Sequence, residues 1–158
     1  MTAWSSTYET SATFGGYTGH SASSGDGLRD GTHTGGTSVW GASASFDGFI
    51  KIDLGATGTV TQIQVCNIDT SFDAWGPSFT DDAIFQGSAN NTDWTNIVTL
   101  TGHSDGNLIT YGSLSASYRY FRITHPSNYL GIGDWFITYT INSSSVPIFM
   151  NQYRQRRS

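Results

Sequence analysis

Short runs in which apolar and polar residues alternate recur along the middle of this chain. In the run GFIKIDLG, Ile50, Ile52 and Leu54 point to one side, while Lys51 and Asp53 point to the other. The same period of two recurs in TVTQIQVC, DDAIFQGS, NIVTLTG, NLITYGSL, YRYFRIT and DWFITYTIN. Because successive side chains of a strand point to opposite faces, each run predicts a half-buried β-strand.

Strands this short and this evenly spaced predict an all-β fold, an antiparallel β-sandwich or jelly roll of about eight strands. The composition agrees, since Glu9 is the only glutamate and Lys51 the only lysine, whereas 14% of the residues are aromatic. A chain of 158 residues is long enough for one core. We expect one domain over residues 1–142, followed by a linker and a basic, partly apolar tail over residues 143–158.

The charge is distributed unevenly. Three of the seven basic residues, Arg154, Arg156 and Arg157, lie in the tail, and the chain up to Met150 carries four basic residues against twelve acidic ones, a net charge of −8. An acidic body repels a phosphate backbone, so we expect no nucleic-acid partner. Cys66 is the only cysteine, which excludes an internal disulfide.

The first residues, MTAWSSTYETSATFGG, contain no apolar stretch of the kind that a secretory signal requires. No run in the chain approaches the length of a membrane span. We therefore expect neither a signal peptide in this chain nor insertion into a membrane.

Three long stretches interrupt the alternating runs. They are GGYTGHSASSGDGLRDGTHTGGTSVW, NIDTSFDAWGPSFTDD after Cys66, and HPSNYLGIGD before the last run. Connections of this length are uncommon unless they are functional, and the loops of a sandwich collect at its two ends. These stretches are therefore expected to form one binding rim.

The order of motifs resembles that of the discoidin domain, the jelly roll of coagulation-factor type C and family-32 carbohydrate-binding modules. The motifs are GLRDGTHTGGTSVW, GFIKIDLG with VTQIQV, FQGSANNTDWTNI, YRYFRIT and GDWFITY, and they span roughly Gly27 to Ile141. The tail has no counterpart, and the family's terminal cysteine pair is absent. The resemblance implies that Arg119 and Arg122 belong to a framework strand, with Asp53 and Asp47 as candidate partners.

The resemblance also implies a structural calcium ion. In similar domains, loop oxygens and an acid on the last strand surround Ca²⁺, which prefers six to eight oxygen ligands. Carried over to this chain, the ligands are the Leu28 carbonyl, Asp30, Thr32, Ser38 and Asp134. The alternative is that Asp30 only forms an Asx-turn.

Binding of a sugar requires an aromatic platform with polar groups beside it. Trp75, in the second long stretch, is the candidate platform, whereas Trp40, Trp94 and Trp135 match framework positions and are expected in the core. Galactose-binding members carry an arginine in the second loop, where this chain has only acids, so we expect neutral or cationic ligands. Acidic loops also argue against phospholipid binding. The residues expected to support the Trp75 platform in the sugar site are Phe72, Tyr129, His33, His20, Asp69 and Asp73.

The stretch GHSDG, residues 102–106, fits the G-x-S-x-G pattern of a hydrolase nucleophile. That motif works only between a strand and a helix, and here strand-like runs stand on both sides. We therefore predict a hairpin turn with His103 and Ser104 facing solvent, a structural role for His125, and no catalytic residues.

These features predict a non-catalytic module that binds cell-surface carbohydrate through loops at one end of a jelly roll. We expect the protein to be located outside the cell or on a virion surface, for example as a phage receptor-binding or decoration protein. The alternative is a structural protein of a virion or surface complex. In that case residues 143–158 would anchor it to other subunits or to a second copy of itself, unless the tail has no role.

Overall fold

The computed structural model of the chain describes residues 8–10, 40–42, 49–68, 77–104, 106–127 and 130–142. All strand pairings in this part of the chain are antiparallel, which confirms the predicted all-β fold. None of the described segments is a helix long and apolar enough to cross a membrane. The elements are β1 (Tyr8–Thr10), β2 (Trp40–Ala42), β3 (Phe49–Cys66), the 3-10 helix η2 (Pro77–Phe79), β4 (Ile84–Ser88), β5 (Thr95–Thr99), β6 (Ile109–Tyr111), β7 (Ala116–Thr124), β8 (Leu130–Ile132) and β9 (Asp134–Ile141).

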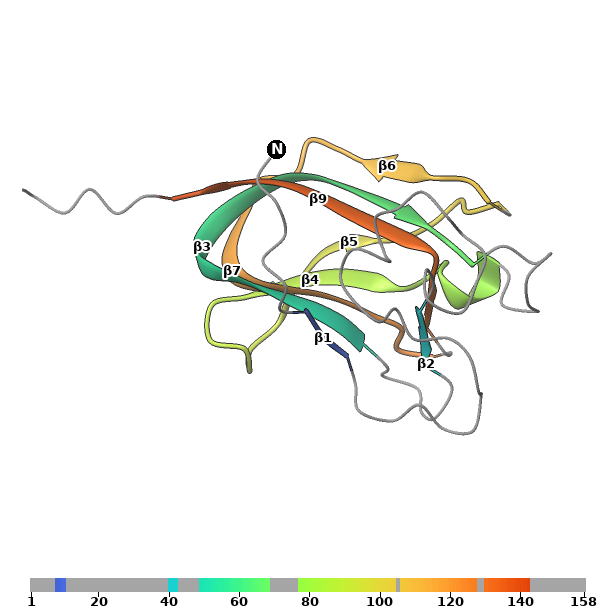
Figure 1. The fold of residues 1–158 in the computed structure, drawn as a ribbon, viewed down its shortest axis with the longest axis horizontal. Coiled ribbons are helices and arrows are strands. Elements are labelled where there is room, and N and C mark those ends of the chain that lie inside the picture. The colour runs from blue at the N-terminus through green and yellow to red at the C-terminus, as the bar shows by residue number, and fades with distance from the viewer. Residues whose placement is uncertain are drawn as a thin grey trace, which may run out of the picture.

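The long strand β3 belongs to both layers of the fold (Figure 1). Its first half lies in the main sheet, whose order is β1-β3-β7-β4-β5. Its second half pairs with β9 and β6. The two runs GFIKIDLG and TVTQIQVC, which look like separate strands in the sequence, are therefore one continuous strand that curls around the core.

The curl of β3 lies between Asp53 and Gly58, where its register with β7 is irregular. Gly55 has a φ of +77° at this point, a conformation that disfavours residues with a side chain. The backbone N–H of Gly55 donates to the Asp53 carboxylate over 2.8 Å, which holds the bend.

The core lies between the two layers and is built from the inward positions of the alternating runs. Ile50, Ile63 and Phe121 are fully buried, as the period of two predicted. Phe85 stacks on Phe121 at 5.5 Å between ring centroids and meets Trp135 edge-on at 6.3 Å. Trp135 is therefore a core residue, as expected.

The outward face of the main sheet carries the three basic residues of the described chain, Lys51, Arg119 and Arg122. The Arg119 guanidinium forms two hydrogen bonds of 2.8 Å with the Asp53 carboxylate, which confirms one of the two predicted partners. Arg122 donates to the Gln86 amide oxygen over 2.6 Å and lies over the Trp94 ring, with 4.2 Å to the centroid. The expectation of Trp94 in the core is wrong, because its half-buried ring supports a guanidinium on this outer face.

Candidate functional site

Three connections meet at one end of the barrel-like sandwich, which we call the loop end. They are the connection that follows β3, the connection between β5 and β6, and the connection that follows β7. The Thr80 hydroxyl donates to the Gly131 carbonyl over 2.6 Å, and the Gly133 N–H donates to the Cys66 carbonyl over 2.9 Å. The second and third of the three predicted loops therefore converge, as the rim hypothesis requires. In its described part the loop end comprises residues 67–68, 77–83, 100–104, 106–108, 125–127 and 130–133.

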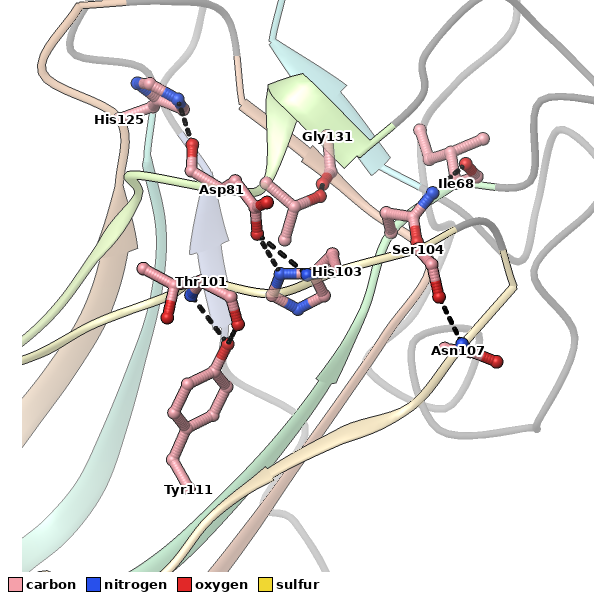
Figure 2. A network of polar contacts seen from close by, with 11 residues as sticks. Ile68, Asp81, Thr101, His103, Ser104, Asn107, Tyr111, His125 and Gly131 are labelled. Carbon is pink, nitrogen blue, oxygen red and sulfur yellow. Dashed lines mark hydrogen bonds and ion pairs between the residues drawn. The ribbon is translucent and has the colours of Figure 1, made fainter.

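Asp81 joins the turn after η2 to the connection between β5 and β6 (Figure 2). Its carboxylate Oδ1 accepts two hydrogen bonds from His103, one from the backbone N–H at 3.0 Å and one from Nδ1 at 2.6 Å. The His103 side chain is fully buried, while that of Asp81 is 33% exposed. Because a carboxylate only accepts, the proton lies on His103 Nδ1, and the buried Nε2 has no hydrogen-bond partner among the described residues.

The backbone of Asp81 holds the third connection as well. His125 is buried, and its Nε2 donates to the Asp81 carbonyl over 2.8 Å (Figure 2). The Ser127 N–H lies 3.4 Å from His125 Nδ1, which suits the same ring tautomer because that nitrogen then accepts. The structural role expected for His125 is thus confirmed, and its partner is the backbone of a different loop.

Tyr111 closes the β5–β6 connection from the side of β6. Its hydroxyl donates to the Thr101 carbonyl over 3.0 Å and accepts from the Thr101 N–H over 2.9 Å. Its ring lies 6.2 Å from that of His103. Burial raises the pKa of the Tyr111 hydroxyl above its ordinary value of 10.0, which favours the protonated form that donates to the Thr101 carbonyl.

The interpretation of GHSDG needs two corrections. The stretch is not a hairpin turn, because β5 pairs with β4 whereas β6 pairs with β3, so the connection crosses from one layer to the other. His103 does not face solvent, because its ring is buried against Asp81, whereas Ser104 is exposed, as predicted. No helix follows the serine in the described chain, so the geometry of a nucleophile elbow is absent there.

The predicted ligand platform lies outside the described residues. This applies to Trp75, Phe72, Tyr129, His33, His20, Asp69 and Asp73. Among the predicted calcium ligands, only Asp134 is described. The other four, Leu28, Asp30, Thr32 and Ser38, are not.

Asp134 is the one predicted calcium ligand whose position is described. It is fully buried at the start of β9, paired in register with Cys66 at the loop end. A buried carboxylate is stabilised by a cation because burying a charge is otherwise costly. No group of three metal-ligating side chains occurs within the described ranges, so the calcium site stays a prediction.

Sequence reasoning missed the network around Asp81. In the sequence, Thr80 and Asp81 are two more polar residues of a long loop, and His103 lies 22 positions further on. A stretch of alternating residues reveals which side chains are buried, but it cannot reveal which loop carbonyl a histidine will reach. One signal in the sequence was available, namely that this part of the chain shows no regular pattern. Irregular backbone needs side chains to satisfy its polar groups, so polar loop residues could have been expected to bind backbone of neighbouring loops.

The sequence between residues 26 and 123 matches a family described as the NedA-like, galactose-binding domain, a member of the coagulation-factor type C group. The chain belongs to this family. The match extends from the first long loop to the end of β7, and so includes most of the loop end. The resemblance to discoidin domains is thereby confirmed. A comparison with curated protein sequences finds no match.

Solved structures with the fold of this galactose-binding-like domain include a fucolectin from striped bass serum, with a TM-score of 0.66 and 18% identity over 87% of this chain and 46% of that one. The C-terminal domain of a chitobiase from Bacteroides fragilis has a TM-score of 0.62 and 17% identity, over 87% and 93% of the two chains. A fucose binding module of Streptococcus pneumoniae has a TM-score of 0.59 and 14% identity, over 85% and 92%. At these identities the likeness shows the jelly-roll fold alone.

Proposed function

We propose that this domain is a non-catalytic module that binds cell-surface carbohydrate through its loop end. The observation that carries the proposal is the convergence of three connections on Asp81, which holds irregular backbone in place at one end of the fold. A fixed set of loops is what a shallow sugar site needs, because loops ordered in advance lose little entropy on binding. Such a module meets its ligand outside the cell or on a virion surface.

The comparisons support a carbohydrate ligand. The family is described as galactose-binding, and two of the structures with the same fold are described as a fucolectin and a fucose binding module. The absence of strand–helix geometry around Ser104 supports a role without catalysis in the described part of the chain.

The charge of the loop end supports a neutral or cationic glycan. In its described part, this end contains two carboxylates that reach solvent, Asp81 and Asp82, besides the buried Asp134, and neither lysine nor arginine. Sialylated and sulfated glycans would be repelled, since like charges at short range are costly in a partly desolvated site. We therefore expect neutral sugars or amino sugars among the ligands.

The test is a glycan array probed with the wild type and with Trp75→Ala. Loss of the large ring should remove the stacking surface and abolish binding, while the melting temperature stays within experimental error. The array should include neutral, amino-sugar, sialylated and sulfated members, so that the charge preference is measured in the same experiment.

Trp94→Ala is the matched control, because it removes a ring from the outer face of the main sheet. It should lower the melting temperature, since Arg122 loses its support, and leave glycan binding unchanged. Undiminished binding by Trp75→Ala together with loss of binding by Trp94→Ala would move the site to the sheet face and refute the proposal.

A further inference from the structure

The only lysine of the chain, Lys51, is a buried residue of β3 with 8% of its surface exposed. Its Nζ donates to the side-chain oxygen of Asn91 over 2.8 Å. The same nitrogen lies 5.7 Å from the centroid of the Phe49 ring. Lysine is seldom buried, because removing its amine from water is costly. In this contact a buried nucleophile lies against the carbonyl group of an amide.

The turn after β4 holds Asn91 in this position. The Asn91 backbone is left-handed, with a φ of +65°, a conformation that asparagine adopts more readily than most residues with a side chain. Its N–H donates to the Ser88 hydroxyl over 2.9 Å. The Asn90 side-chain oxygen accepts from the backbone N–H groups of Thr92 and Asp93. These hydrogen bonds fix the turn, so the Asn91 amide is positioned by the fold and not only by its own contact with the amine.

We propose that the Lys51 amine and the Asn91 carboxamide join in an intramolecular amide bond. The neutral amine attacks Cγ of Asn91, the bond between Nζ and Cγ forms, and the bond between Cγ and Nδ2 breaks. One proton passes from Nζ to Nδ2, which leaves as ammonia. One amide replaces another, so the step needs neither an oxidant nor a cofactor. A fixed geometry with reacting atoms about 3–3.5 Å apart greatly raises the effective concentration of the two groups.

The proton that moves to the leaving ammonia needs a carrier. Glu9, the only glutamate of the chain, occupies the position of β1 directly opposite Lys51. Opposite positions of an antiparallel pair lie on the same face of a sheet. A carboxyl residue at this position suits a general base that takes the proton and returns it to the leaving group. The register therefore makes Glu9 the proton carrier of the reaction.

The bond would join two parts of the sheet that are not direct neighbours. Lys51 lies on β3 and Asn91 follows β4, and β7 stands between these strands in the sheet order. The two residues are 40 positions apart in the sequence. A cross-link that closes a loop of this length stabilises the folded state mainly by restricting the unfolded chain, as a disulfide does. With one cysteine the chain forms no internal disulfide, so the amide would be its covalent cross-link.

The test measures the mass of the intact, unfolded chain and its cleavage by a lysine-specific protease. The wild type should be lighter than its sequence by one ammonia, about 17 Da. Because Lys51 is the only lysine, the protease cuts an unlinked chain once, and it should leave the linked chain whole. A cyclic imide at Asn91 would also lose ammonia, but it would leave Lys51 cleavable. A wild type with the full mass of its sequence, or one that loses ammonia and is still cut at Lys51, would overturn the proposal.

Two variants remove one reacting group each. Lys51→Arg keeps a positive charge, Asn91→Ala removes the carbonyl, and both should keep the full mass of their sequence and melt several degrees below the wild type. The matched control is Asn96→Ala, because Asn96 is another amide of the same sheet face, bonded to Gln86, and this variant should lose ammonia like the wild type. Loss of ammonia by Lys51→Arg would contradict the proposed bond.

Glu9→Gln tests the proton carrier. It should slow formation of the bond about tenfold or more, seen as a smaller linked fraction at early times after synthesis. Formation at the rate of the wild type would overturn the role of Glu9. The cross-linked residues lie on the sheet face, so Lys51→Arg should bind glycans on the array like the wild type. A failure of this proposal is thus distinct from a failure of the proposed carbohydrate site.

Discussion

Two polar networks of this domain use similar side chains for different purposes. On the outer face of the main sheet, Arg122, Gln86 and Asn96 lie in one row across β7, β4 and β5, joined by hydrogen bonds of 2.6 Å between side chains. At the loop end, side chains reach backbone instead. Asp81 accepts from the N–H of His103, and Thr80 donates to the Gly131 carbonyl.

The difference follows from what each backbone lacks. In the sheet, the ladder already satisfies the backbone, so the surface side chains only pair with one another, which stabilises the fold modestly. In the loops there is no ladder, and buried N–H and C=O groups need side-chain partners. Substitutions on the sheet face should therefore change stability alone, whereas substitutions around Asp81 should change the shape of the loop end and hence binding.

Asp81→Ala should have the largest effect. The substitution leaves the buried His103 N–H and imidazole without their acceptor, which costs about 1–3 kcal/mol in the free energy of unfolding. It also frees the β5–β6 connection, so glycan affinity should fall together with stability. Thermal unfolding and the glycan array measure the two effects.

The control is Asp53→Ala, which removes a carboxylate that accepts two hydrogen bonds from Arg119 and one from the Gly55 N–H at the bend of β3. It should lower the melting temperature less and leave binding unchanged, because Arg119 lies on the sheet face. Equal losses of affinity in the two variants would mean that binding follows global stability and not the geometry of the loop end.

Removal of calcium should have the next largest effect and should concern the loop end only. If Asp30 and Asp134 share an ion, a chelator should lower the melting temperature by several degrees, because binding to the folded state alone stabilises it. Asp30→Ala should abolish this sensitivity, while Asp53→Asn should keep it. A wild type that melts at the same temperature with and without chelator would leave the Asx-turn as the role of Asp30.

Acid should weaken the sheet face through a smaller effect. The hydrogen bond from Arg119 holds the pKa of Asp53 below its ordinary value of 3.8, against the opposing effect of partial burial. A lowered pKa in the folded state means that the pair stabilises the protein above pH 3.8 and that this contribution is lost as the pH falls through the folded-state pKa.

The difference in melting temperature between the wild type and Asp53→Asn measures this contribution. It should be present at neutral pH and shrink as the pH falls below 3.8. The effect should be small, since the Arg119 side chain is 42% exposed and water screens the pair. A difference that grows on acidification would contradict the assigned role of the pair.

The sequence predicted the sheet better than it predicted the loop end, for a physical reason. Residues such as Ile63 and Phe121 report their burial through a local period of two. The pair of Arg119 with Asp53 was predicted because a half-buried arginine needs an acidic partner. Strand β8 was missed because Leu130 to Ile132 is too short to show a period, and it lies within a stretch rich in glycine and proline.

The partners of Asp81 were missed because no local rule links residues that far apart. His103 was expected in solvent because a glycine on each side of a short polar stretch is typical of an exposed turn. Its ring is buried because the connection crosses between layers and passes over the core. The predicted platform around Trp75 lies outside the described residues and stays a prediction.

Ser104→Ala should have the smallest effect of all. The hydroxyl is exposed, and its contact is with the Asn107 side chain of the same connection. An exposed hydrogen bond of this kind contributes little, so the melting temperature and the glycan affinity should both match those of the wild type. The Ser104 hydroxyl contacts Asn107 and makes no hydrogen bond with His103 Nε2, the nitrogen that would act as the base, among the described residues. Strands stand on both sides of this connection, so the strained strand-to-helix turn of a hydrolase is also absent there. We therefore expect no turnover of ester, peptide or glycoside substrates by either protein. Turnover by the wild type that disappears in Ser104→Ala would overturn the non-catalytic assignment and make the loop end an active site.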